Sequence, residues 1–431
     1  MRSIVVLVLA AALVWAGFQL FGTKSPGDVH GSEGGGGATL VEPPAGDGPG
    51  TGATGPAATA PEVASPEDAN PFAEVPEVPD FGDPEAWVAL GGDLAHGRLD
   101  AVENALGRIE PPLPASRAQF LRCLVGALAG KEDARTQASA LFERDALDDR
   151  EVALLTCAFG SGEPPAPGGH VDALDLGAEL AVLAAAANRS AALGELQVAA
   201  RRFTRLFDSE LASPWETRPH DLDAWVASLR ELQRRYRWDP RSEWPHLELT
   251  VQNGEGLTSI RQRALEQVPT LHISTGLVAR ANRLTGEVIH PGQTLRVPTD
   301  PVTVLVDVSK HWLLYRIGPD VVDAYPVGTG ARGKETLLGS FVVGNKQKNP
   351  TWFPQGRAPV PFGHPENPLG TRWLGWRLPE SDSDTSFGFH GTWQPDTIGT
   401  DASEGCVRLE NANVEQLFDI LPQGASFVVR P

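Results

Sequence analysis

Residues 23–80 limit what the chain can fold into more than any other part of the sequence. They contain 10 Pro and 11 Gly among 58 positions, together with ten acidic residues and one lysine. Such a segment buries too little apolar area to offset the conformational entropy that ordering it would cost. We therefore predict a disordered, acidic linker over 23–80, with folded domains only after it.

The segment before this linker is apolar. No charged residue occurs between Arg2 and Lys24, and a helix of about 20 apolar residues spans a bilayer core of about 30 Å. We interpret residues 1–22 as a membrane anchor that places the exported chain in the cell envelope or periplasm. A cleaved signal peptide is the alternative interpretation.

Composition excludes several classes of function. The chain has 431 residues, and 36 Lys+Arg against 55 Asp+Glu give a net charge of −19, to which the linker contributes −9. An acidic chain without a long basic run is not expected to bind nucleic acid. Three cysteines are too few for a disulfide scaffold or a four-cysteine zinc site. No His-Glu-x-x-His pattern occurs either, so we predict neither a metal nor another cofactor.

Residues 81–245 are rich in Ala and Leu and predict an all-α domain. Four residues recur at helical spacing and predict one buried face: Trp225, Leu229, Leu232 and Tyr236. The similar sequences around Cys123 and Cys157 lie 34 residues apart, the period of tetratricopeptide-like hairpins, although the consensus positions do not repeat. We expect both cysteines to be buried apolar residues. Without a recognisable catalytic cluster, this domain is predicted to be a scaffold or to bind a protein partner.

Residues 246–299 have a different pattern. A strand-like start at Leu249-Thr250-Val251 precedes helix-forming residues and a closing Pro-Gly-Gln-x-Leu-x-Val-Pro sequence at 291–298. The region resembles a LysM module, a small β-α-α-β unit whose family binds the N-acetylglucosamine-containing glycan of peptidoglycan or chitin. The resemblance makes Asn282 a candidate substrate-binding residue. Extra residues at 266–275 depart from the family pattern, and a packing module that orients its neighbour is the alternative.

Residues 300–431 predict a mainly-β domain. Short runs with β-type alternation lie at 302–308, 312–317, 321–327, 341–344 and 426–429. One helix is expected near the end, capped by Asn411 or Asn413. The predicted fold is therefore multidomain: anchor, linker, helical domain, LysM-like module and C-terminal β domain.

The candidate chemistry lies in this last domain, where His390 and Cys406 are sixteen positions apart. A thiol with a pKa of about 8.5 is mostly protonated at neutral pH, so a nucleophilic cysteine needs an imidazole or a cation close by. We expect the two side chains to meet across neighbouring strands, where facing β-carbons lie about 5 Å apart. Gly391 and Gly405 allow close backbone approach, and the amides of Gly405 and Cys406 are candidate donors to an oxyanion.

Five short motifs resemble the YkuD-type L,D-transpeptidases: His390-Gly391-Thr392, Ser403-x-Gly405-Cys406-Val407-Arg408, Leu338-Gly339-Ser340-Phe341, Asn349-Pro350-Thr351-Trp352 and Asn367-Pro368-Leu369-Gly370. The similarity runs from Thr303 to Val429 and implies a β-sandwich-like catalytic domain. It implies that Cys406 attacks the carbonyl joining the third residue of a peptidoglycan stem peptide to D-Ala. His390 would serve as base and acid, with a carbonyl near Gly391 holding its ring. Transfer of the acyl group to an amine would give a 3→3 crosslink.

The same resemblance implies roles around the nucleophile. Ser403 and Gly405 would shape its loop, and Arg408 would support the loop or bind a carboxylate. Leu338 stands where the family usually has proline, which alters a turn but removes no reactive group. Glu404 is expected to face solvent, because an acid beside the sulfur would raise the pKa of the thiol.

Substrate contacts are predicted nearby. Trp352, Thr392 and Arg372 are candidate substrate-binding residues, while Trp373 and Trp376 suit either the groove or the core. Residues 346–372 contain six prolines and predict a long ordered loop that caps the acyl-enzyme and excludes water. Four cations in it are expected to meet acidic stem peptides, with solvent as the alternative: Lys346, Lys348, Arg357 and Arg372.

Three functions stay open on the sequence alone. They are an L,D-transpeptidase, an L,D-carboxypeptidase with water as acceptor, and a non-catalytic peptidoglycan-binding scaffold. The presence of both Cys406 and His390 favours an enzyme. The expected partners are the stem peptides and glycan strands of peptidoglycan, the membrane through residues 1–22, and a protein partner of the helical domain.

Overall fold

The computed structural model describes residues 84–108, 115–144, 146–166, 172–381 and 383–431. The anchor predicted at 1–22 and the linker predicted at 23–80 lie outside the described residues. Residues Pro79–Pro431 form one compact unit. In the described ranges, no helix combines the length and the apolar character that crossing a membrane requires.

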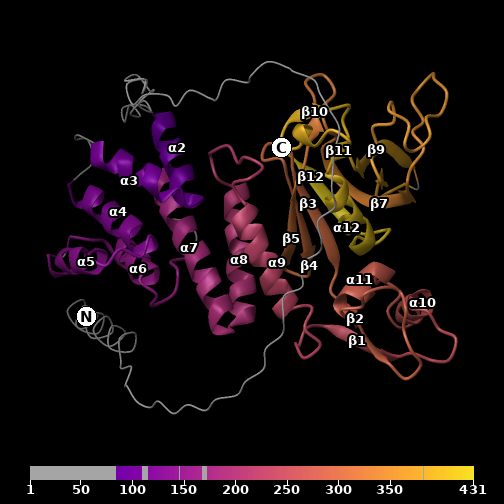
Figure 1. Ribbon diagram of the computed structural model, residues 1–431, viewed down its shortest axis with the longest axis horizontal. Coiled ribbons are helices and arrows are strands. Elements are labelled where there is room, and N and C mark those ends of the chain that lie inside the picture. Colours follow the sequence, from indigo (N-terminus) through magenta and orange to yellow (C-terminus); the bar gives the residue numbers. More distant parts are fainter. Residues whose placement is uncertain (1–83, 109–114, 145, 167–171, 382) are drawn as a thin grey trace, which may run out of the picture. The chain divides into compact units, whose positions relative to one another are not determined.

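The helical region predicted for 81–245 contains the helices α2 to α9 (Figure 1). Their bounds are α2 Pro84–Ala95, α3 Leu99–Arg108, α4 Ala115–Leu128, α5 Ala134–Glu143, α6 Asp149–Ala158, α7 Ala173–Leu193, α8 Leu196–Leu211 and α9 Asp223–Arg235. Local sequence sets several helix ends. Asp148 and Glu151 form a capping box at the start of α6, and Asp172 caps α7. Gly194 ends α7 in the left-handed conformation, with a φ of 84°.

Two hydrophobic clusters stabilise the helical region. The first joins α2 to α7 and includes Cys123 and Cys157, which are buried as predicted and form no disulfide. The second joins α7, α8 and α9 to apolar residues of the C-terminal sheet, among them Trp312 and Leu314. Three residues of the predicted stripe on α9 are buried in it, and the fourth is partly exposed: Trp225, Leu229, Leu232 and Tyr236. The helices therefore share a core with the domain that follows.

The predicted β-α-α-β order of residues 246–299 is present. The elements are β1 His246–Thr250, α10 Leu257–Gln267, α11 Thr275–Ala281 and β2 Thr294–Pro298, and the two strands pair antiparallel. The extra residues between the helices join this unit to the C-terminal domain, because Ser274 Oγ donates to the Asp419 carbonyl oxygen at 2.6 Å. The likeness to a LysM module stays a prediction.

The C-terminal domain is built on one eight-stranded sheet with the order β11-β9-β8-β7-β12-β3-β4-β5. The strands are β3 Val302–Asp307, β4 Trp312–Ile317, β5 Asp320–Pro326, β7 Gly339–Lys348, β8 Arg372–Arg377, β9 Asp384–His390, β11 Val407–Arg408 and β12 Ser426–Arg430. Neighbours pair antiparallel except β12 with β3 and β11 with β9, which are parallel. Beside it, β6 Thr329–Gly330 pairs in parallel with β10 Asp401–Ser403. The remaining elements are the short 3₁₀ helix η1 Pro395–Thr397 and the helix α12 Asn411–Ile420.

The mainly-β prediction for this domain is confirmed, and β3, β4, β5 and β12 lie where the alternating runs predicted them. The strands β8, β9 and β11 were not predicted. The implied sandwich-like arrangement is instead a single continuous sheet with the short β6–β10 pair. The predicted helix is α12, but its predicted cap is wrong. The N-cap residue is Glu410, whose side chain makes no capping hydrogen bond. The Asn411 side chain is hydrogen-bonded to other segments of the chain.

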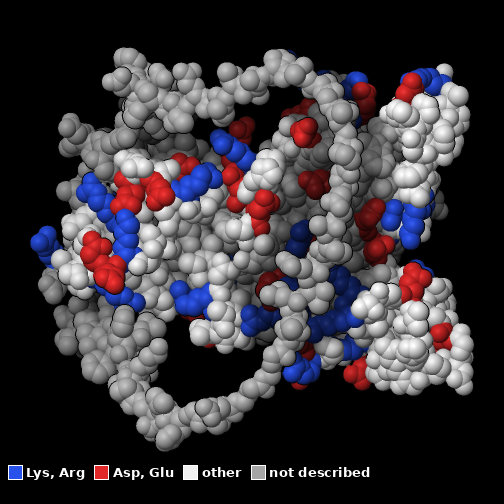
Figure 2. Space-filling model, in the orientation of Figure 1, with Lys and Arg blue, Asp and Glu red and all other residues white. Residues whose placement is uncertain are grey.

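The two ends of the sheet have different surroundings. Helices α8 and α9 pack against β5 at one end (Figure 1), and β11 and β9 form the other. On the face drawn in Figure 2, acidic side chains are interspersed with basic ones over the helical region. The end formed by β11 and β9 carries the candidate chemistry.

Candidate active site

The loop that carries Cys406 joins β10 to β11 and is fixed by two hydrogen bonds. Ser403 Oγ donates to the Cys406 carbonyl oxygen at 2.6 Å and accepts the Gly405 N–H at 3.0 Å. Gly405 has a φ of 109°, and a β-carbon there would lie 2.6 Å from the Phe387 ring. Only glycine fits this turn without strain. The loop presents Cys406 as a partly exposed thiol.

His390 is the last residue of β9 and is only 3% exposed. Its ring Nδ1 lies 2.6 Å from the Gly391 carbonyl oxygen, which can only accept a hydrogen bond. The neutral ring therefore carries its proton on Nδ1 and keeps a lone pair on Nε2. A basic nitrogen is thus fixed in a known tautomer at the end of the strand.

The pairing of β9 with β11 brings the two motifs together. The register is parallel, with Val407 opposite Phe389 and Arg408 opposite His390. Arg408 therefore occupies the facing position that we expected for Cys406. The cysteine lies two residues before Arg408 in the chain, directly before β11 begins. No hydrogen bond joins Cys406 to His390 in the described part of the chain.

Both reactive groups are uncharged at neutral pH. Burial raises the pKa of the Cys406 thiol to about 11, although a backbone hydrogen bond from Gly388 and the charge of Arg408 oppose the shift. Burial lowers the pKa of His390 to about 4, with the hydrogen bond to Gly391 opposing the shift and the Arg408 charge adding to it. The resting pair is therefore a thiol and a neutral imidazole, rather than the thiolate that we expected the imidazole to favour.

Arg408 is the cation closest in register to this pair. Burial lowers the pKa of its guanidinium, while Cys406 and Glu404 act in the opposite direction. Its Nε atom is buried and has no hydrogen-bond partner within the described residues. Glu404 faces solvent and forms an ion pair with Lys334, so the prediction that it points away from the sulfur is confirmed.

An indole ring covers the histidine. Trp373 on β8 lies opposite His390, and the two rings are stacked with centroids 6.1 Å apart and planes inclined by 23°. A β-carbon at Gly388 would lie 2.6 Å from the Trp373 ring, so glycine makes room for the indole. Sequence reasoning missed Gly388, although an isolated glycine inside a strand indicates such a close approach. Trp376, in contrast, is fully buried in the core.

The predicted loop between β7 and β8 is ordered by its own contacts. Asn367 is buried, and its side-chain amide donates to the carbonyl oxygens of Pro350 and Val360, both at 3.0 Å. At the outer side of the loop, the Phe362 ring contacts the Trp393 ring, with centroids 6.0 Å apart. Because Trp393 follows His390 by three residues, this contact ties the loop to the segment that carries the histidine.

The four predicted substrate-binding residues occupy different surroundings. Trp352 is partly exposed on the loop, where its backbone pairs with Val360. Thr392 is buried, and its Oγ1 accepts the Gln394 N–H at 3.0 Å. Arg372 points to α12, with its guanidinium 3.6 Å from the Glu415 carboxylate. A substrate contact at any of these three residues stays a prediction.

Asn282 lies apart from them, in the β-α-α-β unit. Its amide nitrogen donates to the carbonyl oxygens of Val278 and Arg296, both at 2.8 Å, and its Oδ1 accepts the Arg296 N–H at 2.8 Å. These bonds close α11 onto β2. A glycan contact at Asn282 stays a prediction.

Lys346, expected to meet acidic stem peptides or else solvent, contacts the chain itself. Its ammonium donates to the Leu421 carbonyl oxygen at 2.7 Å and to that of Phe418, at the C-terminal end of α12. Burial lowers its pKa to about 8. Arg357 is paired with Glu366 on the loop. Both cations therefore have partners within the chain.

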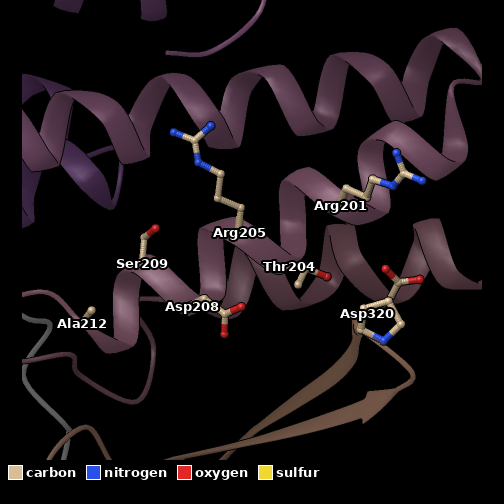
Figure 3. A pocket seen from close by; sticks show the side chains of 8 residues that line it. Arg201, Thr204, Arg205, Asp208, Ser209, Ala212 and Asp320 are labelled. Atoms are coloured by element: carbon tan, nitrogen blue, oxygen red, sulfur yellow. The ribbon is translucent and has the colours of Figure 1, made fainter. Parts of the chain in front are cut away.

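A cavity of about 620 Å³ lies elsewhere, between α8 and the turn that joins β4 to β5 (Figure 3). Its charged groups are largely paired within the chain: Arg205 with Glu179, Asp208 with Arg316, and Asp320 with Arg237. Neither cysteine nor histidine lines it in the described residues. Cys406 stays the predicted nucleophile.

Comparison with known proteins bears on the family of the C-terminal domain. A family profile described as the YkuD L,D-transpeptidase catalytic domain matches residues 301–429. The chain is 32% identical over 133 residues to the Bacillus subtilis protein named "Putative L,D-transpeptidase YqjB", which covers 31% of this chain and 73% of that relative. It is 28% identical over 185 residues to "Putative L,D-transpeptidase YkuD" of the same organism, which covers 42% of this chain and 96% of the relative. An L,D-transpeptidase structure from Mycobacterium smegmatis aligns with a TM-score of 0.25 and 19% identity, over 32% of this chain and 64% of that one.

The chain belongs to the L,D-transpeptidase family and is an enzyme of that class. The resemblance drawn from the five motifs is thereby confirmed, with nearly the same boundaries.

Proposed function

We propose that this enzyme is a cysteine-dependent L,D-transpeptidase that acts on peptidoglycan stem peptides through an acyl-enzyme on Cys406. The observation that carries the proposal is the register of β9 and β11. It pairs the strand that ends at His390, whose Nδ1 is held by a backbone carbonyl, with the strand that begins directly after Cys406. A nucleophile, a base and a group that orients the base are the three parts that acyl transfer requires.

The proton transfer starts from a neutral pair. The His390 tautomer leaves Nε2 free to accept the Cys406 proton, and the raised pKa of the thiol keeps the sulfur protonated until a substrate is bound. Catalytic hydrogen bonds are often long in a free enzyme and shorten in the substrate complex. We infer that closure over the stem peptide brings Sγ to Nε2, so that thiolate forms only where the scissile carbonyl is present.

Two acyl transfers follow in this scheme. The Cys406 sulfur bonds to the carbonyl carbon of the third stem residue while its proton passes to His390 Nε2. The tetrahedral intermediate then collapses, the C–N bond breaks, and His390 returns the proton to the departing D-Ala amine, which leaves a thioester. An acceptor amine attacks the thioester, forms a new amide and restores the thiol. A neighbouring diamino-acid side chain as acceptor gives a 3→3 crosslink.

Charge stabilisation is assigned to the nucleophile loop and its neighbour. Because Ser403 already accepts the Gly405 N–H, the oxyanion role that we expected for two amides is left to the Cys406 N–H. The unpartnered Nε of Arg408 gives that guanidinium capacity to bind a substrate carboxylate or the developing negative charge. Ser403 and Gly405 act by holding the loop.

The loop between β7 and β8 is assigned to water exclusion. Its contact with the segment after His390, through Phe362 and Trp393, supports this assignment. Removing water from a thioester favours transfer to an amine over hydrolysis. The proposal also locates the enzyme in the cell envelope, with the β-α-α-β unit contacting glycan and the helical region available to a protein partner.

The decisive experiment uses tetrapeptide-containing muropeptides and the purified chain without residues 1–22. We expect mass spectrometry to detect D-Ala release together with a crosslinked dimer, and Cys406→Ala to abolish both by about a thousandfold or more. D-Ala or tripeptide without dimer would indicate a carboxypeptidase. Glycan binding with no turnover by the unsubstituted enzyme would indicate a scaffold and overturn the proposal.

A further inference from the structure

Asn411, the first residue of α12, holds two separate segments of the site together. Its Oδ1 accepts the Thr371 N–H at 3.1 Å, and its Nδ2 donates to the Thr392 carbonyl oxygen at 2.9 Å. Thr371 immediately precedes β8, and Thr392 follows His390 by two residues. The amide thus uses both its acceptor and one of its donors on backbone groups outside its own helix.

Two glycines make space for this amide. A β-carbon at Gly391 would lie 2.1 Å from Asn411 Oδ1, and one at Gly370 would lie 2.3 Å from the same atom. Gly391 is not in the left-handed region, so its backbone conformation does not by itself require glycine. The requirement comes from the close approach of the Asn411 amide. The slot is therefore shaped for this side chain.

The slot adjoins the group that orients the catalytic base. The Gly391 carbonyl accepts the His390 Nδ1 proton, and the peptide bond that carries it continues into Thr392, whose own carbonyl is held by Asn411. On the other side, the Gly391 N–H donates to the Arg372 carbonyl oxygen at 3.3 Å, although this bond is long. Asn411 supplies the shorter bond that fixes the direction of the Gly391 carbonyl.

We infer that Asn411 is a positioning residue for His390. By holding the Thr392 carbonyl and filling the glycine slot, it aims the Gly391 carbonyl at Nδ1 and so keeps the Nε2 lone pair available to the thiol. A role in helix capping alone does not explain these contacts. The N-cap residue is Glu410, and the Asn411 amide is hydrogen-bonded to backbone groups of other segments. For its effect on turnover, the inference rests on the proposed function.

Three variants of the full chain test it: Asn411→Ala, Asn411→Asp and the control Asn413→Ala on the same helical turn. Aspartate keeps an oxygen for the Thr371 N–H but loses the donor to Thr392. As an acid at a helix N-terminus it is also favourable for the helix. We expect Asn411→Asp to keep the fold, with a somewhat lower melting temperature because a carboxylate oxygen then faces the Thr392 carbonyl oxygen, and to lower kcat about 10- to 100-fold with little change in KM. Asn413→Ala should keep both.

A second readout reports on the histidine directly. In ¹⁵N NMR of the imidazole, the wild-type ring should show the Nδ1–H tautomer, and both Asn411 variants should show a mixture with Nε2–H. Wild-type NMR and wild-type kcat in Asn411→Asp would overturn the inference, as would a lower kcat with an unchanged tautomer. If the unsubstituted enzyme does not turn over muropeptides, the proposed function fails, but the NMR result still decides the role of Asn411. If Asn411→Ala does not fold, Asn411→Asp decides alone.

Discussion

The two ends of the eight-stranded sheet contain different kinds of buried polar group. At the β5 end, Asp323 is fully buried and accepts hydrogen bonds from Arg230 Nε at 2.7 Å, Tyr325 Oη at 2.9 Å and the Ala324 N–H at 3.0 Å. Arg280 lies 3.5 Å from the same carboxylate. These partners come from α9, α11 and β5, so one buried charge joins the helical region, the β-α-α-β unit and the sheet.

At the β11 end, some polar groups have hydrogen-bonding atoms without a partner in the described residues. His390 has a free lone pair on Nε2, and Arg408 Nε has no partner within the described residues. The Cys406 thiol donates one hydrogen bond within the described residues, a 3.9 Å contact with the Ser386 carbonyl oxygen. Unpartnered buried atoms also occur beside β5, at Arg237 and Gln233, so they do not distinguish the two ends by themselves. What distinguishes the β11 end is that it carries a thiol and an imidazole, whereas at the β5 end a buried carboxylate holds domains together.

The largest expected effect is on stability at the β5 end. Replacing Asp323 by alanine leaves two arginines and a buried tyrosine hydroxyl without their acceptor. We expect a loss of about 3 to 4 kcal/mol, near the low end for a broken buried ion pair because the arginines are partly exposed. Urea unfolding measures it. Asp208→Ala, which removes a more exposed ion pair with Arg316, should cost less than about 1 kcal/mol. Equal losses in the two variants would show that burial of the Asp323 carboxylate adds nothing to its contribution.

At the β11 end, the contribution of His390 to the free energy of unfolding should depend on pH. The pKa of His390 is lowered from 6.5 to about 4 in the folded state, so the unfolded state binds the proton first as the pH falls. The stabilisation is present above pH 6.5 and is lost between pH 6.5 and 4. The shift corresponds to about 3 kcal/mol at full extent. His390→Gln should lack this part of the acid destabilisation, as measured by urea unfolding at pH 7 and pH 4.5. A parallel pH dependence in the two proteins would contradict the burial of a neutral imidazole.

A smaller effect is expected at the nucleophile loop. Gly405→Ala combines a left-handed backbone with a contact of 2.6 Å to the Phe387 ring. We expect a loss of about 1–3 kcal/mol in urea unfolding. Gly333→Ala is a matched control, because its φ is 82° and nothing lies within 4 Å of its added β-carbon. If both substitutions cost the same, the packing of Phe387 plays no part in fixing the loop.

The smallest effect concerns the loop over the site and depends on the proposed function. Phe362→Ala removes the ring contact with Trp393, which is partly exposed and therefore worth about 0.5 kcal/mol. We expect the ratio of hydrolysis to transfer to rise about twofold in the muropeptide assay. Phe353→Ala, on the same loop with 70% exposure, should leave the ratio unchanged. A ratio unaffected by Phe362→Ala would show that the loop does not exclude water through this contact.

The sequence predicted the parts of the fold that have local signals. The strands from Val302 to Pro326 alternate, the stripe on α9 repeats at helical spacing, and the motifs around His390 and Cys406 belong to a known family. The order of elements in residues 246–299 also followed from local pattern. These features depend on neighbours within a few positions, where side-chain periodicity is informative.

The parts that could not be predicted depend on distant contacts. The strand β11 has two residues and no periodicity, so nothing local indicated that Arg408, rather than Cys406, would face His390. The side chain of Asn411 resembled an ordinary helix cap, because its partners Thr371 and Thr392 are 40 and 19 positions away. The neutral state of the thiol and the imidazole likewise results from burial. The positions of Cys406 and His390 in the sequence do not indicate how deeply either side chain is buried.

The slot that Gly370 and Gly391 form around Asn411 has an evolutionary consequence. A larger side chain at either glycine position collides with the amide oxygen, and a shorter residue at 411 opens a void beside the base. At Gly370 a side chain is strained whatever residue stands at 411, because its φ is 62°, whereas at Gly391 a joint exchange with residue 411 refills the same space. Positions 391 and 411 are therefore expected to be epistatic and to co-vary when many descendants of this gene are aligned.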